Sequence, residues 1–206
     1  MSVANSNRTL KARERDTKVG GMPTAPKLIM ITDEARAPFA TSAVCALPRG
    51  SAVLFRDYTL SSRLETGKYI LRICRRRGIR FLVAGDGHLA AKLRADGIHM
   101  PEPLVHHALV WRQWRPNWFI TVAAHSAKAL WQAKRAGADA ALLSPVFATK
   151  SHPNARTLQS VKFAKMASRS PIPVYALGGI NNSTAKRLFG AKLCGIAAVS
   201  ALAPLL

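Results

Sequence analysis

The chain has 206 residues, of which 49% are hydrophobic, a composition that suits one globular domain with a full core. No run approaches the roughly 18 apolar residues that a membrane-spanning helix needs, so the composition excludes a transmembrane protein. Thirty-one lysines and arginines against ten acidic residues give a net charge of +21, far more than solubility requires. A field of this sign attracts nucleic acid, anionic lipid or phosphorylated small molecules.

Residues 1–25 predict a disordered basic N-terminal extension, because they combine a run of charges with few large apolar side chains. They lack the apolar core of a secretory signal, so we expect a cytoplasmic protein. Met22 directly precedes the first strand-like run, and both Met1 and Met22 stay open as the true start.

The three cysteines, Cys45, Cys74 and Cys194, are widely spaced and form no CxxC pair. An odd number without metal-ligand spacing argues against a disulfide frame or a zinc site. We therefore expect buried or idle thiols.

Residues 26–206 alternate short apolar runs with amphipathic stretches. The runs are nearly continuously apolar, as in parallel strands that are buried on both faces. We predict strands at residues 27–32, 52–55, 80–84, 97–100, 119–124, 140–144, 174–177 and 195–200. We predict helices at residues 62–77, 87–95, 103–114, 127–136, 157–167 and 183–190. This alternation predicts an α/β domain, a (β/α)8 TIM barrel, and leaves a doubly wound open sheet as the alternative.

The helical ring of this barrel should be incomplete. Only six residues follow Ser200, which predicts a truncated C-terminal helix, and residues 34–50 contain two prolines and have weak helical character. Such a barrel should leave apolar surface uncovered, and a homodimer would cover it.

Five arginines form the densest charge cluster. On a helix over residues 60–78 they would face water while the apolar side chains face inward. Both a solvated helix surface and an RNA-binding patch stay open, although no RNP-like, zinc-finger or helix-turn-helix motif supports the second. The cluster consists of Arg72, Arg75, Arg76, Arg77 and Arg80.

Polar or glycine residues stand where each predicted strand ends. In a (β/α)8 barrel these carboxyl ends carry the active site. The coincidence over eight strands predicts a site built from Asp33, Arg56, Gly85, Asp86, His99, His125, Ser126, residues 144–152, Gly178, Gly179 and Ser200.

Gly178 and Gly179 end the seventh strand and lead into a helix, for which Asn182 or Ser183 is the expected N-cap. Glycines let backbone N–H groups approach an anion, and a helix N-terminus adds its positive end. Ser200 ends the eighth strand, and the loops after strands seven and eight form the usual phosphate site of these barrels. We therefore predict a phosphate site here; a tight turn without a ligand is the alternative.

His125 follows the fifth strand. An imidazole at the mouth of a barrel can transfer protons near neutral pH, so His125 is a candidate acid or base. A histidine that only helps to begin the next helix is the alternative.

These residues resemble a known family. The resemblance to the thiamine phosphate synthase/TenI family covers about residues 27–203 and is most specific from Gly137 to Leu202. It rests on the ordered motifs LIMITD, LFRD, ADGIHM, VAAHS, RAGADAALLSPVFAT, PVYALGGINNSTAKRL and GIAAVSAL. The resemblance implies one of two reactions. The synthases join a pyrimidine diphosphate to a thiazole phosphate with the help of magnesium, whereas TenI proteins isomerise a thiazole carboxylate phosphate with a histidine and no metal.

The resemblance also implies roles for single residues. Gly178, Gly179 and Ser200 fall on the thiazole-phosphate site, and Arg56 falls on an arginine that reaches the diphosphate. The other matched positions are the histidine at the end of the family's fifth strand, at His125, and the hydroxyl and loop residues near the substrates, at Ser126, Thr149, Lys150 and Ser151.

The diphosphate half departs from the family pattern. The family's Q-x-R-x-K reads L-F-R-D-Y at residues 54–58, and its asparagine-aspartate pair reads Ala84-Gly85, with Asp86 one place further on. G-Q-E-D reads P-E-P-L at residues 101–104, and P-T-x-T-K reads A-T-K-S-H at residues 148–152. Magnesium commonly needs one or two carboxylates. Asp86 is a weak candidate ligand and Glu102 is the alternative, so Mg²⁺ stays an open cofactor rather than an expected one.

Three functions therefore stay open. The first is a thiamine phosphate synthase-like transferase with an eroded diphosphate site, which the resemblance favours. The second is a TenI-like isomerase that uses His125. The third is a non-catalytic barrel that binds a phosphorylated ligand or RNA.

Overall fold

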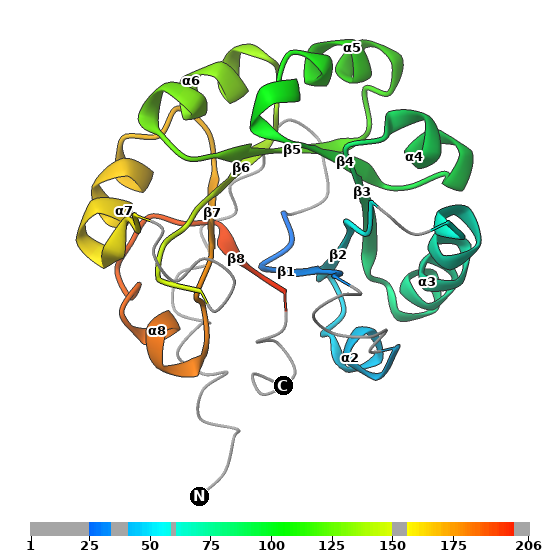
Figure 1. Ribbon diagram of the computed structural model, residues 1–206, viewed down its shortest axis with the longest axis horizontal. Helices are drawn as coiled ribbons and strands as arrows, with labels where there is room; N and C mark the ends of the chain where they lie inside the picture. Colours follow the sequence, from blue (N-terminus) through cyan, green and yellow to red (C-terminus); the bar gives the residue numbers. More distant parts are fainter. Residues whose placement is uncertain (1–24, 34–40, 59–60, 150–155, 200–206) are drawn as a thin grey trace, which may run out of the picture.

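The computed structural model describes residues 25–33, 41–58, 61–149 and 156–199. Eight parallel strands close into a barrel in sequence order, with β8 hydrogen-bonded to β1 (Figure 1). This confirms the (β/α)8 barrel and excludes the open sheet. The strands are β1 (Leu28–Ile31), β2 (Ala52–Phe55), β3 (Arg80–Ala84), β4 (Gly97–Met100), β5 (Phe119–Ala124), β6 (Ala140–Leu143), β7 (Val174–Leu177) and β8 (Gly195–Ala198).

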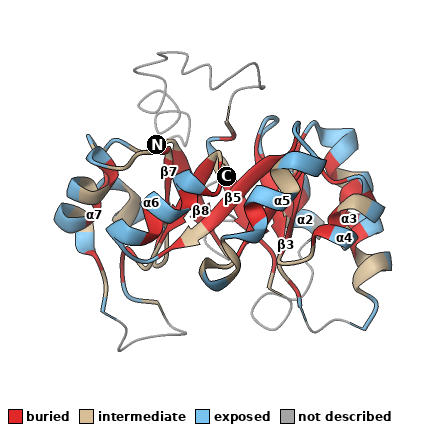
Figure 2. Cartoon of the chain, turned by 90° about the horizontal axis from the view of Figure 1, so that it is seen from above, coloured by how far each residue is buried: buried red, intermediate tan, exposed pale blue. Residues whose placement is uncertain are grey.

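The helices surround the barrel, with buried strands inside and exposed helix faces outside (Figures 1 and 2). They are α2 (Thr41–Ala46), α3 (Arg63–Arg77), α4 (Gly87–Leu93), the 3-10 turn η2 (Glu102–Leu104), α5 (His107–Trp114), α6 (Ala127–Arg135), α7 (Gln159–Ser168) and α8 (Asn182–Lys186). None of the helices in the described ranges is long and apolar enough to span a bilayer.

Alternation along each strand builds two apolar layers. In β2, Ala52 and Leu54 belong to the layer inside the barrel, whereas Val53 and Phe55 belong to the layer between strands and helices. Since successive side chains of a strand point to opposite faces, Arg56 continues the inward row. The alternation along β2 therefore directs the Arg56 side chain toward the axis of the barrel, just above the packed interior.

Two aspartates stabilise the end of the barrel opposite this arginine. Asp96, just before β4, accepts the N–H of Phe81 in β3 at 2.7 Å, and Asp139, just before β6, accepts the N–H of Ile120 in β5 at 2.7 Å. Each aspartate thus joins the start of its own strand to the start of the preceding one. These are the aspartates of the ADG and GAD motifs, and their role here is structural.

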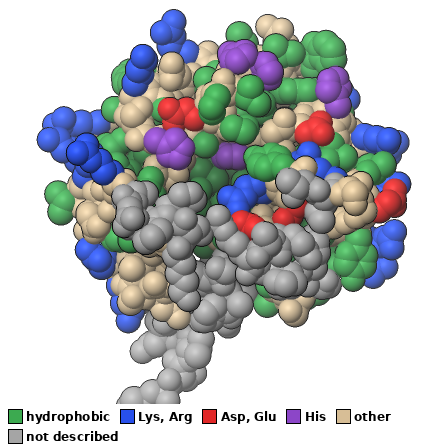
Figure 3. Space-filling view, in the orientation of Figure 1, with side chains coloured by type: hydrophobic (Ala, Val, Ile, Leu, Met, Phe, Trp, Pro, Cys, Tyr) green, Lys and Arg blue, Asp and Glu red, His purple; other side chains and the backbone are tan. Residues whose placement is uncertain are grey.

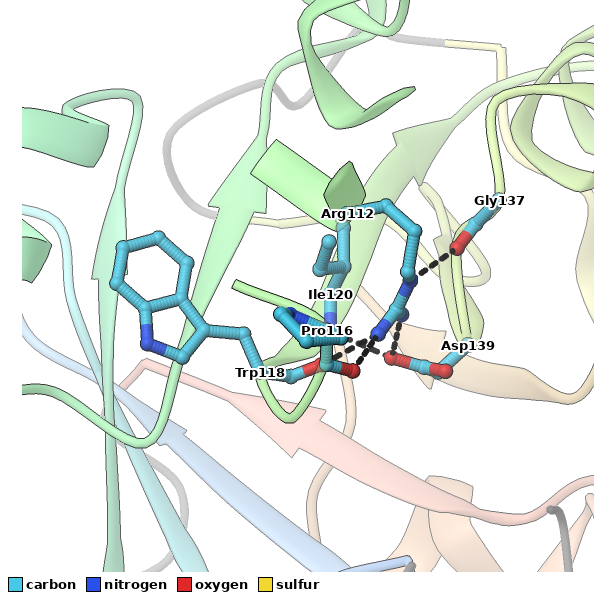
Figure 4. Close-up of polar contacts among 6 residues, drawn as sticks. All are labelled: Arg112, Pro116, Trp118, Ile120, Gly137 and Asp139. Atoms are coloured by element: carbon cyan, nitrogen blue, oxygen red, sulfur yellow. Dashed lines mark hydrogen bonds and ion pairs between the residues drawn. The ribbon is translucent and has the colours of Figure 1, made fainter. Parts of the chain in front are cut away.

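Arg112 of α5 completes the second of these junctions (Figure 4). Its guanidinium donates to Asp139 Oδ2 at 2.6 Å and to the carbonyl oxygens of Pro116, Trp118 and Gly137 at 2.7, 3.0 and 3.2 Å. One side chain therefore satisfies three carbonyls around the start of β5 and the start of β6.

The structure departs from the expected elements in three places. The helix expected over residues 103–114 is split into η2 and α5, and a short helix, α2, occupies part of the weakly helical segment at residues 34–50. The helix expected over residues 183–190 ends early, because α8 stops at Lys186. Arg80 lies in β3, in agreement with the strand expected at residues 80–84, and its guanidinium lies over the Phe119 ring at 5.6 Å, apart from the other four arginines of the cluster. The expected C-terminal truncation and almost all of the basic extension lie outside the described residues.

The three thiols are free, as expected. Cys74 is buried and Cys194 is half-buried, and burial is the main reason that the pKa of each is raised to about 12. Cys45 is exposed.

Candidate active site

The mouth of the barrel gathers basic, acidic and histidine side chains near the centre of the face seen in Figure 3. On the β1–β2 side, Arg56 Nη2 donates to the Asp33 carboxylate, and Thr32 Oγ1 donates to the buried carboxylate of Asp57. The Thr32 hydroxyl also accepts the backbone N–H of Arg56 at 3.1 Å. These contacts fix Arg56, whose side chain keeps 31% of its surface exposed, as a cation that an incoming anion can reach.

A second arginine lies on the β2–β3 side of the mouth. Arg63, the first residue of α3, donates to the Ala84 carbonyl at 2.8 Å and lies 3.4 Å from Asp86 Oδ2. Its guanidinium carbon is 5.5 Å from the ring centroids of Phe55 and Tyr58. No sequence motif indicates Arg63, because its position depends on contacts with residues at the ends of β2 and β3.

His99 occupies the interior of the mouth. It is 7% exposed, and its Nδ1 lies 3.0 Å from the hydroxyl of buried Thr121. Burial, reinforced by the positive charge of Arg56, lowers the pKa of His99 to about 4. The imidazole is therefore neutral at physiological pH.

His125 lies at the end of β5 and is held by its neighbours. Its backbone N–H donates to Glu102 Oε2 at 2.8 Å, and its Nδ1 lies 2.8 Å from the Ser144 carbonyl. A carbonyl can only accept, so Nδ1 carries the proton and Nε2 has the free lone pair in the neutral ring. This tautomer suits an acid or base at the mouth.

Ser126, by contrast, begins a helix. Its hydroxyl accepts the N–H of Ala129 at 3.1 Å and so caps the N-terminus of α6. Its single hydroxyl hydrogen is the group left to meet a substrate.

The turn after β7 exposes backbone donors. Gly178 and Gly179 both have positive φ, at 98° and 64°. The carbonyl of Gly178 accepts from Phe147 N at 3.0 Å, and that of Gly179 accepts from Thr184 Oγ1 at 2.8 Å. Within the described ranges, the N–H groups of Gly179 and Ile180 donate no hydrogen bond. Both carbonyls are thus satisfied while two N–H groups are left for an anion.

The helix after this turn contributes less than expected. Its N-cap is Asn181, not Asn182 or Ser183, and the Asn181 side chain accepts the N–H groups of Ser183 and Thr184, each at 3.0 Å. Those two N–H groups are already satisfied. The anion site therefore depends on the glycine turn and not on the first turn of α8.

Several expected site residues cannot be placed. Lys150, Ser151 and Ser200 lie outside the described residues. Thr149, at the end of the loop after β6, is half-buried.

The described carboxylates do not fit a magnesium ion. Asp86 accepts the Leu89 N–H at 2.9 Å as the N-cap of α4, and its other oxygen faces Arg63. Glu102 accepts the His125 N–H, and Asp33 pairs with Arg56. In the described part of the chain, no three His, Cys, Asp or Glu residues come together as metal ligands.

Comparison with known proteins gives one consistent result. The family model described as thiamine monophosphate synthase matches residues 28–202. A putative thiamine-phosphate synthase 2 from Aquifex aeolicus is 31% identical over 180 residues, which are 85% of this chain and 96% of that protein. The thiamine-phosphate synthase of Pyrococcus abyssi is also 31% identical, over 85% of this chain and 86% of its own length.

A solved structure agrees with the sequence relatives. The thiamine phosphate pyrophosphorylase from Pyrococcus furiosus superposes with a TM-score of 0.74 at 28% identity, covering 86% of this chain and 87% of that one. A 3-keto-L-gulonate-6-phosphate decarboxylase from Vibrio cholerae, at 11% identity and a TM-score of 0.63, shares the fold alone.

Proposed function

Because the chain belongs to the thiamine monophosphate synthase (TMP-TENI) family, we propose that it is a thiamine phosphate synthase-like transferase of thiamine biosynthesis. In this reaction the C–O bond of a hydroxymethylpyrimidine diphosphate breaks and inorganic diphosphate leaves. The nitrogen of a thiazole phosphate then forms a C–N bond to the pyrimidine cation. The protein must therefore hold two anionic groups at one mouth, with the reacting atoms between them.

The observation that carries this proposal is the glycine turn after β7. Two backbone N–H groups, those of Gly179 and Ile180, have no partner among the described residues, and they stand next to β8 at the carboxyl end of the barrel. Charge-assisted hydrogen bonds from such groups suit a phosphate monoester. We assign them to the thiazole phosphate.

Arg56 lies on a different side of the mouth. Strands β1 and β8 separate β2 from β7, so an anion on Arg56 and an anion on the glycine turn would lie apart, across the axis of the barrel. We assign the diphosphate to Arg56, whose guanidinium can offer two parallel N–H donors to phosphate oxygens. The bond that breaks and the bond that forms would then lie over the centre of the mouth.

The test is direct synthesis. The full chain is incubated with both substrates, with and without added magnesium, and thiamine phosphate is measured by its oxidation to a fluorescent thiochrome. We expect product formation and a loss of about a hundredfold in kcat/KM for Arg56→Ala, the scale of a lost charge-assisted contact. Absence of product under every condition would rule out the transferase.

One observation favours a second candidate, a TenI-like isomerase. The contact between His125 Nδ1 and the Ser144 carbonyl leaves Nε2 as a proton acceptor. Isomerisation of a thiazole carboxylate phosphate should then be insensitive to chelator and should be abolished in His125→Gln. An unchanged rate in that variant would remove this candidate.

The remaining partners stay separate hypotheses. The transfer reaction requires neither a homodimer nor nucleic acid. A cytoplasmic location belongs to the same proposal, and the small phosphorylated substrates of the reaction support it. Light scattering gives the mass in solution and so tests whether the chain forms a homodimer. An RNA-binding function predicts an affinity that falls steeply with salt, because binding releases counterions.

A further inference from the structure

Arg63 lies at the rim of the mouth, and only some of the N–H donors of its guanidinium have hydrogen-bond acceptors. Of its five N–H donors, two contact Ala84 O and Asp86 Oδ2. Its Nε is buried and has no acceptor in the described part of the chain. The Asp86 contact is long, at 3.4 Å, and 41% of the Asp86 side chain is exposed, so this ion pair leaves much of the positive charge uncompensated.

Two departures from the family pattern meet beside Arg63. Tyr58 stands at the position of the family's lysine and Gly85 at that of its aspartate. In the structure, a Cβ added at Gly85 would lie 3.0 Å from the Tyr58 ring. The Tyr58 ring thus occupies the space into which a carboxylate side chain at position 85 would project. The departures at positions 58 and 85 therefore form one continuous surface.

Arg56 and Arg63 act on the same part of this surface. Burial raises the pKa of the Tyr58 hydroxyl, and the positive charges of Arg56 and Arg63 both oppose that rise. The hydroxyl therefore lies within the field of both guanidinium groups. A diphosphate ester carries charge on two phosphoryl groups, which matches a pair of cations better than a single one.

We propose that Arg63 is a diphosphate-binding residue, which together with Arg56 supplies the positive charge that a magnesium ion would otherwise bring to the leaving group. This inference rests on the proposed transferase function for its substrate. It accounts for the absence of a fitting carboxylate set among the described residues, because a guanidinium needs no metal ligands. Arg63 also needs little reorganisation, since Phe55 and Ala84 already fix its side chain.

The test uses inorganic diphosphate as the probe and the full chain as the protein. Binding is measured by calorimetry in excess EDTA and again with magnesium. We expect binding in EDTA, and a loss of about ten- to a hundredfold in affinity for Arg63→Met, the scale of one or two charge-assisted hydrogen bonds. Arg63→Lys should retain part of the affinity, since it keeps the charge without the planar donors.

The matched control is Arg72→Met, which removes an exposed arginine from the same helix. It should bind diphosphate within about twofold of the native chain, whereas a simple effect of net charge would weaken both variants alike. Thermal unfolding checks that each variant is folded. If Arg63→Met is unfolded, Arg63→Lys and Arg63→Gln carry the comparison.

The outcomes separate this inference from the proposed function. Diphosphate binding that needs magnesium, or that is unchanged in every folded Arg63 variant, overturns the role of Arg63 even if the native chain makes thiamine phosphate. Conversely, metal-free binding that is lost in the Arg63 variants supports the role of Arg63 even if no thiamine phosphate forms.

Discussion

At the scale of single residues, the contacts at the mouth distinguish groups of the same chemical type. His99 lies in β4 and His125 directly follows β5. His99 is buried against Thr121, whereas His125 is exposed and held through its Nδ1. Asp33 is turned toward Arg56, whereas Asp86 begins a helix. Residue type alone gives neither distinction, because each depends on a partner from a neighbouring strand.

Burial of His99 predicts a specific pH dependence of stability. The unfolded chain takes up a proton on this histidine near pH 6.5, but the folded protein does so only near pH 4. The unfolded state therefore binds more protons in this window, and the free energy of unfolding should fall by up to about 3 kcal/mol as the pH decreases from 6.5 to 4. Urea unfolding curves at several pH values measure it.

The control separates His99 from other groups that titrate. In His99→Gln, the part of the pH dependence due to this imidazole should disappear, leaving a shallower curve between pH 6.5 and 4. The exposed His107→Gln variant should keep the native curve. Parallel curves for the native chain and His99→Gln would show that the histidine is not buried in its neutral form.

At the scale of elements, the glycine turn after β7 packs tightly against the loop after β6. A Cβ at Gly179 would lie 2.5 Å from the Ala148 carbonyl oxygen and 2.7 Å from Phe147 Cβ. Gly179→Ala should therefore force the turn away from the loop after β6 and displace the N–H groups assigned to the phosphate. We expect KM for the thiazole phosphate to rise about tenfold or more, with a smaller change in KM for the pyrimidine diphosphate.

Gly190 offers a matched control for this substitution. Its φ is also positive, at 80°, and nothing lies within 4 Å of a Cβ added there. Gly190→Ala should cost roughly 1–2 kcal/mol of backbone strain without changing KM. Equal kinetic effects of the two variants would contradict the assigned phosphate site.

The contact network of Arg112 gives a prediction for stability alone. Arg112→Met removes four hydrogen bonds between α5 and the starts of β5 and β6, and it leaves Asp139 without its cation. We expect a loss of about 2–4 kcal/mol in the free energy of unfolding. Because these contacts lie at the end opposite the mouth, kcat/KM should stay within about twofold at a temperature where the variant is folded.

Denaturant unfolding and steady-state kinetics on the same preparation test this separation. Arg135→Met, on the exposed last turn of α6, is the matched control and should change neither quantity appreciably. A large fall in kcat/KM for folded Arg112→Met would contradict a purely structural role.

The strands could be predicted from the sequence more closely than the helices. Continuous apolar runs with polar ends gave the bounds of β2, β3, β4, β5 and β7 as the structure has them. Helix starts were harder, because residues 181–184 are all good caps, and only contact with the preceding turn selects Asn181. The same limit applies to the site: Arg63 and the Tyr58–Gly85 contact join separate strands, and no local pattern indicates them.

At the scale of the whole molecule, most of the positive charge lies outside the first 26 residues. The first 26 residues hold five basic and two acidic side chains, so the remaining 180 residues keep +18 of the +21. Part of this charge lies on the outer face of α3, where Arg72, Arg75, Arg76 and Arg77 are exposed. This confirms the solvent-facing surface expected for these four arginines and creates a field that reaches beyond the mouth.

Such a field should speed the capture of anionic substrates. At low salt the field of these charges extends over roughly tens of ångströms. At about 0.5 M salt, screening limits it to a few ångströms from each charge. We expect kcat/KM for the pyrimidine diphosphate to fall several-fold as NaCl rises from about 50 to about 500 mM, while kcat at saturating substrate changes little. The double variant Arg72→Gln, Arg76→Gln should weaken this dependence without altering kcat, because neither side chain is in the mouth. Steady-state kinetics across the salt series measure both quantities. A flat kcat/KM, or a dependence that the double variant leaves untouched, would mean that the charge on α3 serves another partner.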